Sequence, residues 1–155
     1  MDEQPQHDRP AEALVVVDLV GALATAADGI EGHVEAEAER YITAAVKLEH
    51  HCPSDVVIAQ ITNNLLTYCS SLAIGVSQIP EDQRPERGTA AVRMWMELVA
   101  AGPQDGPLGN WSHARQLGIA GRALLQALHE HRHASSRRAR FVGRTELPPV
   151  PAESP

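Results

Sequence analysis

AAVRMWMELVAAGPQDGPLGNWSHARQLGIAGRALLQAL, residues 90–128, is the stretch that decides the fold of this 155-residue chain. It contains a helical segment, a Gly/Pro elbow at residues 103–110 and a long second helix, and both tryptophans, Trp95 and Trp111, lie in it. Apolar residues recur three and four apart in both helical segments, which is the spacing of one buried helix face. On the first segment they are Ala91, Met94, Trp95 and Leu98, and on the second Ala114, Leu117, Gly121, Leu124 and Leu128.

The glycines at positions 118 and 121 fall inside the second of these helices. Each costs about 1 kcal/mol relative to alanine in an exposed helix. We therefore expect another helix to approach closely at this point.

Three further helices are expected upstream. Residues 11–27 form the first, and Asp28-Gly29 is expected to stop it. Residues 30–49 repeat apolar positions by four and three, and Pro53 prevents simple continuation of this helix. A third helix starts after Ser54, a good N-cap residue, and carries a broad apolar stripe. That stripe comprises Ile58, Ile61, Leu65, Tyr68, Cys69, Leu72 and Val76.

One early segment admits two interpretations. The β-branched run LVVVDLV, residues 14–20, resembles a buried strand. A parallel sheet needs several such strands, and no second convincing one follows. We therefore expect a helix here.

The composition excludes several classes of protein. Hydrophobic residues make up 43% of the chain, so a core without disulfides is attainable. The net charge of −7 argues against generic nucleic-acid binding, although the charge is uneven: residues 1–55 carry 12 acidic and 3 basic groups, and residues 111–155 carry 3 and 7. No apolar run approaches the roughly 20 residues that a membrane span needs. The polar N-terminus does not resemble a signal peptide, so we expect a cytoplasmic protein with no membrane association.

His129-Glu130-His131-Arg132-His133 matches the spacing H-E-x-x-H, in which two histidines four apart share a helix face and can bind a metal. A third ligand and a substrate cleft would be needed for zinc-dependent hydrolysis, and the sequence supplies neither. A polar helix end explains the segment better. The metal site at His129 and His133 is kept as an alternative.

Two other clusters are candidates for binding. Four arginines lie within eight residues and could contact phosphates, although a solvated segment is the favoured interpretation. They are Arg137, Arg138, Arg140 and Arg144. At the elbow, Trp111 beside His113 and Arg115 would form a partner-binding site if it were exposed, and would be part of the core if it were not.

The segment GPQDGPLGNWSHARQLGIAGRALLQALHEHR, residues 102–132, with Gly32-His33 upstream, resembles a family of small actinobacterial proteins labelled as natural-product-biosynthesis proteins. The chain departs from that family at Ala127-Leu128-His129, where its members often have Cys-Asp-His. The resemblance implies a helical, non-enzymatic accessory protein and no catalytic residues.

The sequence thus predicts an all-α fold of about five helices in a compact antiparallel bundle. The expected organisation is a disordered lead at residues 1–10, the bundle at 11–134 and a disordered Arg- then Pro-rich tail at 135–155. The predicted function is that of a non-enzymatic interaction or regulatory module without a cofactor, which binds a protein partner or itself because its apolar stripes are wide. The alternatives are a metal-dependent helical enzyme and a nucleic-acid-associated regulator.

Overall fold

The structure, a computed structural model, describes residues 10–50 and 52–142, with side chains described for 21–50 and 52–140. These residues form four α-helices and one short 3₁₀ helix, and no strand occurs among them. The elements are α1 (Pro10–Lys47), η1 (Leu48–His50), α2 (Asp55–Gln78), α3 (Glu86–Ala101) and α4 (Gly109–Val142). The all-α prediction is confirmed, including the helix at residues 14–20, but the number of helices is four and not five.

The expected stop at Asp28-Gly29 is wrong, since α1 runs through both residues without a break. Glycine disfavours a helix by about 1 kcal/mol relative to alanine, but unlike proline it leaves every backbone hydrogen bond intact. Between Pro10 and Pro53 no proline interrupts the chain. The alanine and glutamate residues on both sides of Gly29 favour helix strongly enough to carry α1 across it.

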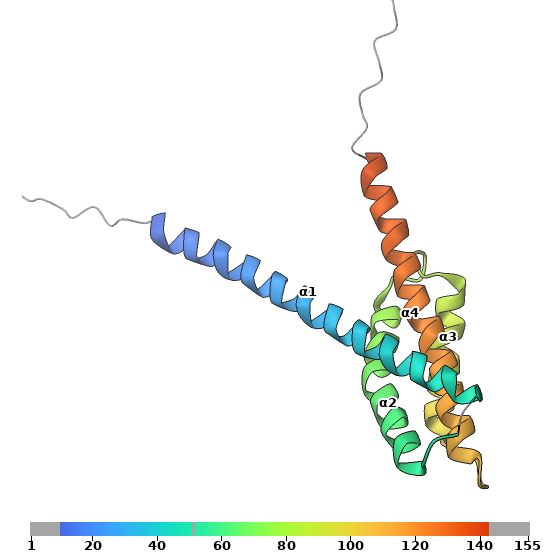
Figure 1. Cartoon of the computed structure of the whole chain (residues 1–155). Helices are drawn as coiled ribbons and strands as arrows, with labels where there is room; N and C mark the ends of the chain where they lie inside the picture. The colour runs from blue at the N-terminus through green and yellow to red at the C-terminus, as the bar shows by residue number, and fades with distance from the viewer. Residues whose placement is uncertain (1–9, 51, 143–155) are drawn as a thin grey trace, which may run out of the picture.

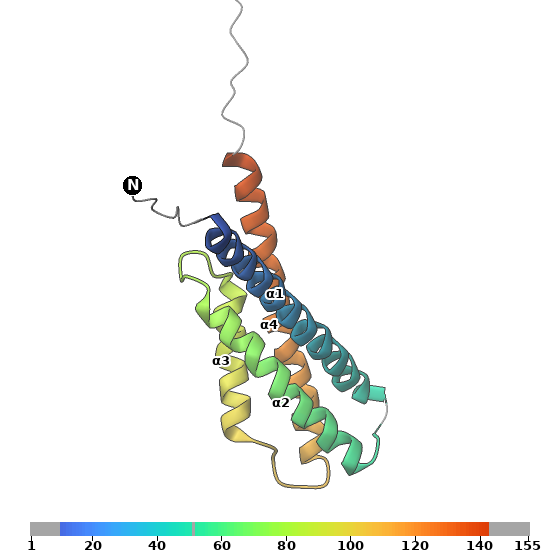
Figure 2. The same ribbon diagram turned by 90° about the vertical axis from the view of Figure 1, so that its left-hand side faces the viewer.

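α2 and α4 each pack against all the other α-helices, whereas α1 and α3 do not contact each other within the described residues. Figure 1 shows α2 and α3 running alongside α4. Only the C-terminal half of α1 crosses α2 and α4. The N-terminal half of α1 extends away from the other helices, and Figure 2 shows it leaving the same end of the bundle as the last turns of α4.

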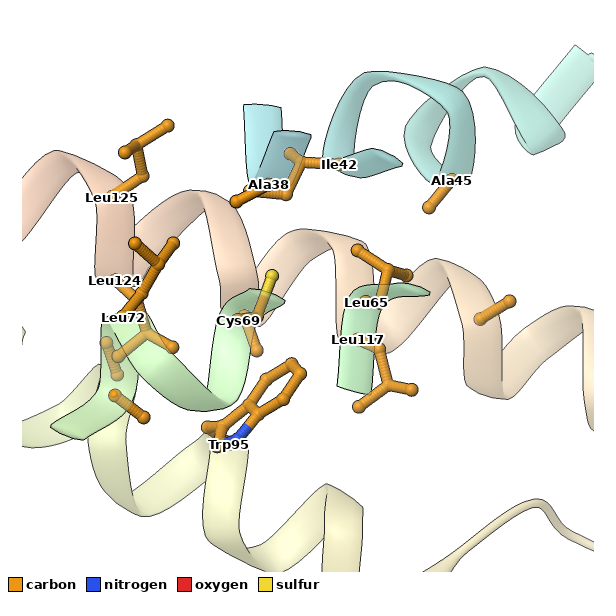
Figure 3. Packing of buried hydrophobic residues seen from close by; sticks show 14 of the residues in the cluster. Ala38, Ile42, Ala45, Leu65, Cys69, Leu72, Trp95, Leu117, Leu124 and Leu125 are labelled. Carbon is orange, nitrogen blue, oxygen red and sulfur yellow. The ribbon is translucent and has the colours of Figure 1, made fainter. Parts of the chain in front are cut away.

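The core is aliphatic and follows the predicted stripes. Figure 3 shows side chains from all four helices meeting around Leu65, Cys69 and Trp95. Within α2 the predicted stripe is buried except for Tyr68, which is half-buried and stacked on Tyr41 of α1. On α3, Ala91 and Trp95 are buried as expected, while Met94 is exposed.

The glycines of α4 lie where α1 and α2 cross it, which confirms the expected close approach. A Cβ on Gly118 would lie 2.6 Å from the Cβ of Ala45 on α1. A Cβ on Gly121 would lie 2.7 Å from the sulfur of Cys69 on α2. Because real Cβ atoms do not come this close to other heavy atoms, these two glycines set the distance between α4 and its neighbours.

The predicted domain limits are only partly reproduced. The expected tail from residue 135 is wrong for residues 135–142, which continue α4. This segment contains alanine and arginine, both good helix formers, and has no glycine or proline before Gly143. The expected disordered lead and the remainder of the tail lie outside the described residues, apart from Pro10, which begins α1.

Candidate functional site

The two helices that extend beyond the bundle form a fork. One side is the α1 arm, residues 21–33, in which every residue is exposed. The other side is the α4 arm, residues 133–140, in which every residue except the half-buried Ala134 is exposed. The two arms diverge as they leave the bundle (Figure 1).

A groove of about 520 Å³ occupies the base of this fork, between α1, α2 and α4. We call it the fork groove. Its apolar lining comes from all three helices and the start of the α2–α3 loop. The apolar lining residues are Ile30, Val34, Leu72, Ile74, Ile79 and Leu128.

An ion pair between α1 and α4 joins the two sides of the fork at its base. Both terminal guanidinium nitrogens of Arg132 donate hydrogen bonds to the carboxylate of Glu35, one of them at 2.8 Å. These hydrogen bonds hold the pKa of Glu35 below its ordinary value of 4.5, against the opposing effect of burial. The same bonds raise the pKa of Arg132. His129 adds a weaker contact, with Nε2 lying 3.6 Å from Glu35 Oε2.

The bundle-facing side of α1 continues, uncovered, along the α1 arm. Val34, Ala38 and Ala45 on this side pack into the core. Leu23 and Ile30 lie on the same side at helical spacing, yet they are 62% and 65% exposed. The α1 arm, residues 21–33, therefore presents an apolar face like the one with which the rest of α1 packs on the bundle. None of the described residues covers this face.

The two arms, together with the helical turns that join them to the bundle, carry opposite charge. On α1, residues 28–39 contain acidic and no Lys or Arg side chains, and on α4, residues 131–142 contain basic and no acidic ones. The acidic residues are Asp28, Glu31, Glu35, Glu37 and Glu39, and the basic ones are Arg132, Arg137, Arg138 and Arg140. Glu35 meets Arg132 and His129 at the base of the fork, and no described ion pair joins residues 21–33 to residues 133–140.

The histidines predicted as metal ligands are not assembled into a metal site. His129 and His133 are both exposed on α4, and His129 faces Glu35. Glu130, the expected general base of the motif, forms an ion pair with Arg87 of α3 at 3.1 Å. No group of three metal-binding side chains occurs within the described residues. The contacts of His129 and Glu130 therefore support structural roles.

The arginines predicted to contact phosphates lie on the α4 arm. Arg137, Arg138 and Arg140 are exposed and belong to one helix, whereas Arg144 lies outside the described residues. Across the fork, the acidic residues of α1 oppose the approach of a polyanion.

The elbow holds Trp111 and Arg115 in contacts within the chain. Trp111 is half-buried, and its Nε1 donates a 3.1 Å hydrogen bond to the carbonyl of Leu48, the first residue of η1. The guanidinium of Arg115 lies 5.1 Å from the centre of the Trp111 ring and 3.5 Å from Glu49. These contacts attach the start of α4 to η1, the short helix that directly follows α1.

His113 is directed into the bundle and is only 6% exposed. It lines a second cavity of about 290 Å³ between α2, the end of α3 and the start of α4. Burial lowers the pKa of this imidazole from its ordinary value of 6.5. The structure therefore does not place His113 on one exposed surface with Trp111 and Arg115, as a partner-binding site at the elbow would require.

The two cysteines are unpaired and differ in environment. Cys69 is fully enclosed in the core, and burial raises the pKa of its thiol to about 12, whereas Cys52 is exposed after η1. The core position of Cys69 matches its place in the predicted stripe of α2. A thiol with so high a pKa stays protonated and behaves as a small apolar side chain.

Sequence reasoning did not identify the fork. The apolar spacing of residues 30–49 predicts that Glu35 lies outside the apolar stripe, and no sequence pattern distinguishes Leu23 and Ile30 as exposed. The one available signal is the opposite charge of the two ends of the chain, which fits solubility, a pairing of the two ends within the chain or a partner, and does not distinguish among them. None of the helices in the described ranges is both long and apolar enough to cross a membrane.

Comparison with known proteins gives a family and no function. No curated protein and no solved structure matches the chain. A family model described as "Family of unknown function (DUF6415)" matches residues 36–133. The match covers the helical bundle, and both arms of the fork lie outside it except for His133. The resemblance to natural-product-biosynthesis proteins stays a prediction. Since the match spans more than half of its 155 residues, the chain belongs to the DUF6415 family.

Proposed function

We propose that this protein is a small helical interaction module that binds a protein partner or a second copy of itself in the fork. The observation that carries the proposal is the uncovered continuation of the bundle-facing side of α1, with Leu23 and Ile30 exposed above the fork groove. Removing apolar surface from water is favourable by about 25 cal/mol per Å². A partner helix that covers this face would therefore gain stability from it.

The fork fits a protein partner better than the elbow does. At the elbow, Trp111 and Arg115 are engaged with η1, and His113 is buried. In the fork, an apolar centre is bordered by charged side chains on both arms, which is the usual arrangement of a protein interface. The partner-binding role predicted for Trp111, His113 and Arg115 is therefore transferred to the fork.

The proposal includes an accessory or regulatory role without a cofactor, in the cytoplasm. The unpaired Cys52 and Cys69 favour a reducing compartment, because exposed thiols are kept reduced there. The resemblance to accessory proteins of natural-product biosynthesis suggests the setting in which a partner would be sought.

The test compares the wild-type protein with a variant that carries Leu23→Asp and Ile30→Asp. Met96→Asp on α3 serves as the matched control, because Met96 is also exposed, at 64%, but lies away from the fork. Each tagged protein is recovered from its own cells, and bound species are quantified by mass spectrometry and oligomeric mass by light scattering. We expect a stoichiometric complex with the wild type and the control, and a loss of at least about tenfold with the fork variant.

Circular dichroism checks that all three proteins are folded. A complex that persists in the fork variant would contradict the proposal. Loss of the complex in the Met96→Asp control to the same extent would also contradict it.

A further inference from the structure

We propose that the partner seated in the fork is a second copy of this chain, related by a two-fold axis, with each α1 arm lying in the fork of the other copy. This inference rests on the proposed function and names its partner. It is drawn from the apolar surface and from the charges of the described residues on the two arms.

The apolar surfaces of the fork are self-complementary. Each chain supplies an apolar helix face, through Leu23 and Ile30, and an apolar groove that Ile30 lines together with Ile74 and Leu128. A two-fold axis uses the same surface twice, so inserting one α1 arm into the fork of the other copy makes the reciprocal contact at once. Both apolar features are then covered in both chains.

The charges of the arms are complementary in the same arrangement. An α1 arm lying in the fork of a second copy would bring its acidic Asp28 and Glu31 towards the basic Arg137 and Arg138 of that copy. Within one chain these four residues form no described ion pair, because the arms diverge. Two-fold symmetry would form each contact twice.

The ion pair at the base of the fork shows that α1 and α4 interact by pairing an acidic side chain of α1 with a basic side chain of α4. Arg132 and Glu35 form charge-assisted hydrogen bonds where the helices are still close. Glu31, one turn before Glu35, also raises the pKa of Arg132 by its charge. Further along the arms, the same pairing requires a second chain.

The experiment measures the mass of the full-length protein by analytical ultracentrifugation over a range of concentrations. The acidic-arm variant carries Asp28→Arg and Glu31→Arg, and the basic-arm variant carries Arg137→Glu and Arg138→Glu. We expect a wild-type dimer that weakens as salt is added, and a dissociation constant at least about tenfold higher for each variant alone.

The two variants mixed together provide the sharpest test. A chain with two positive arms and a chain with two negative arms repel their own copies but complement each other in both contacts. We expect the mixture to form a one-to-one heterodimer, and a single chain with all four changes to regain the homodimer. A chain with Arg93→Glu and Glu97→Arg on exposed positions of α3 serves as a control and should dimerise like the wild type.

Several results would overturn the inference. A wild-type protein that stays monomeric at millimolar concentration excludes a second copy, and if a different protein is still captured through Leu23 and Ile30, the proposed function stands without it. A dimer that ignores both charge reversals places the contact elsewhere. If a single-stranded DNA probe binds the wild type and not the basic-arm variant, while no dimer forms, the α4 arm binds nucleic acid. Failure of both the dimer and the fork-dependent capture removes the proposed function as well.

Discussion

Gly118 lies where α4 crosses α1, and it shows how one residue sets the distance between two helices. The Cβ of an alanine there would lie 2.6 Å from the Cβ of Ala45, which is attached to backbone and cannot rotate away. We expect Gly118→Ala to lower the free energy of unfolding by about 1 to 2 kcal/mol, because overpacking outweighs the better helix propensity of alanine. Urea denaturation measures the change.

Gly75→Ala on α2 is the matched control for this prediction. Its Cβ would lie 3.5 Å from a methyl carbon of Leu128, an ordinary van der Waals contact. We expect this variant to be more stable by up to about 1 kcal/mol. If both substitutions changed the free energy of unfolding equally, the close approach of α1 and α4 at Gly118 would be contradicted.

Glu35 links α1 to α4, and its contribution to stability depends on pH. Because Arg132 lowers the pKa of Glu35 in the folded protein, the stabilisation is fully present above the ordinary value of 4.5 and is lost as the pH falls through the lowered pKa. We expect Glu35→Gln to be less stable than the wild type at pH 7 and the difference to shrink in acid. Glu130→Gln, which removes an exposed pair with Arg87, is the control and should cost less.

His113 also makes the stability depend on pH, but it is a base rather than an acid and acts over a higher pH range than Glu35. Burial lowers the pKa of this base, so the unfolded chain binds the proton more tightly than the folded one. Stability from the neutral imidazole is fully present above the ordinary value of 6.5 and falls as the pH drops below it. We expect His113→Gln to flatten the pH dependence of the unfolding free energy between pH 7 and the lowered pKa, and chemical denaturation at a series of pH values measures this.

Some of these residue-level features could be predicted from the sequence and others could not. Glycines at helical spacing inside an apolar stripe predict a close approach, and Gly118 and Gly121 confirm it. The pair of Glu35 with Arg132 joins residues 97 positions apart, and it depends on the angle at which α1 crosses α4. No local pattern encodes that angle, so Glu35 was expected to face solvent.

At the scale of helices, α1 departs most from the prediction. A local signal, Asp28-Gly29, suggested an end, but a helix ends where the chain has contacts to gain by turning, and no described residue packs against the α1 arm. The end of α4 shows the same effect, since residues 135–142 continue a helix that has little to pack on. Helix propensity explains why both arms are helical, whereas tertiary packing explains why the predicted apolar stripes of α2, α3 and α4 are buried.

The α1 arm should therefore be dispensable for the stability of the monomeric bundle. We expect a chain lacking residues 1–26 to unfold within about 0.5 kcal/mol of the wild type, because residues 21–26, the part of this segment whose side chains are described, are all exposed, and such positions contribute little. Chemical denaturation under conditions that keep both chains monomeric measures this. A loss of several kcal/mol would show that the arm packs against the bundle.

At the scale of the whole molecule, the fork is the feature that a closed bundle would not have. The bundle at residues 36–133 is the part that the family model matches, and the arms extend it with an acidic helix on one side and a basic helix on the other. The sequence showed the opposite charges of the two ends but not that both leave the same end of the bundle. That juxtaposition follows from α1 crossing α4 and from both helices running longer than predicted.

The measurement that tests the fork most directly is photo-crosslinking in the protein's own cells, with a benzophenone amino acid at position 23. Leu23 lies on the uncovered face of α1, and the same group at Met96 on α3 is the control. We predict one discrete crosslinked product from position 23, with the mass of two copies of this chain, and no such product from position 96. No product from position 23, or the same products from both positions, would contradict the fork as the binding surface.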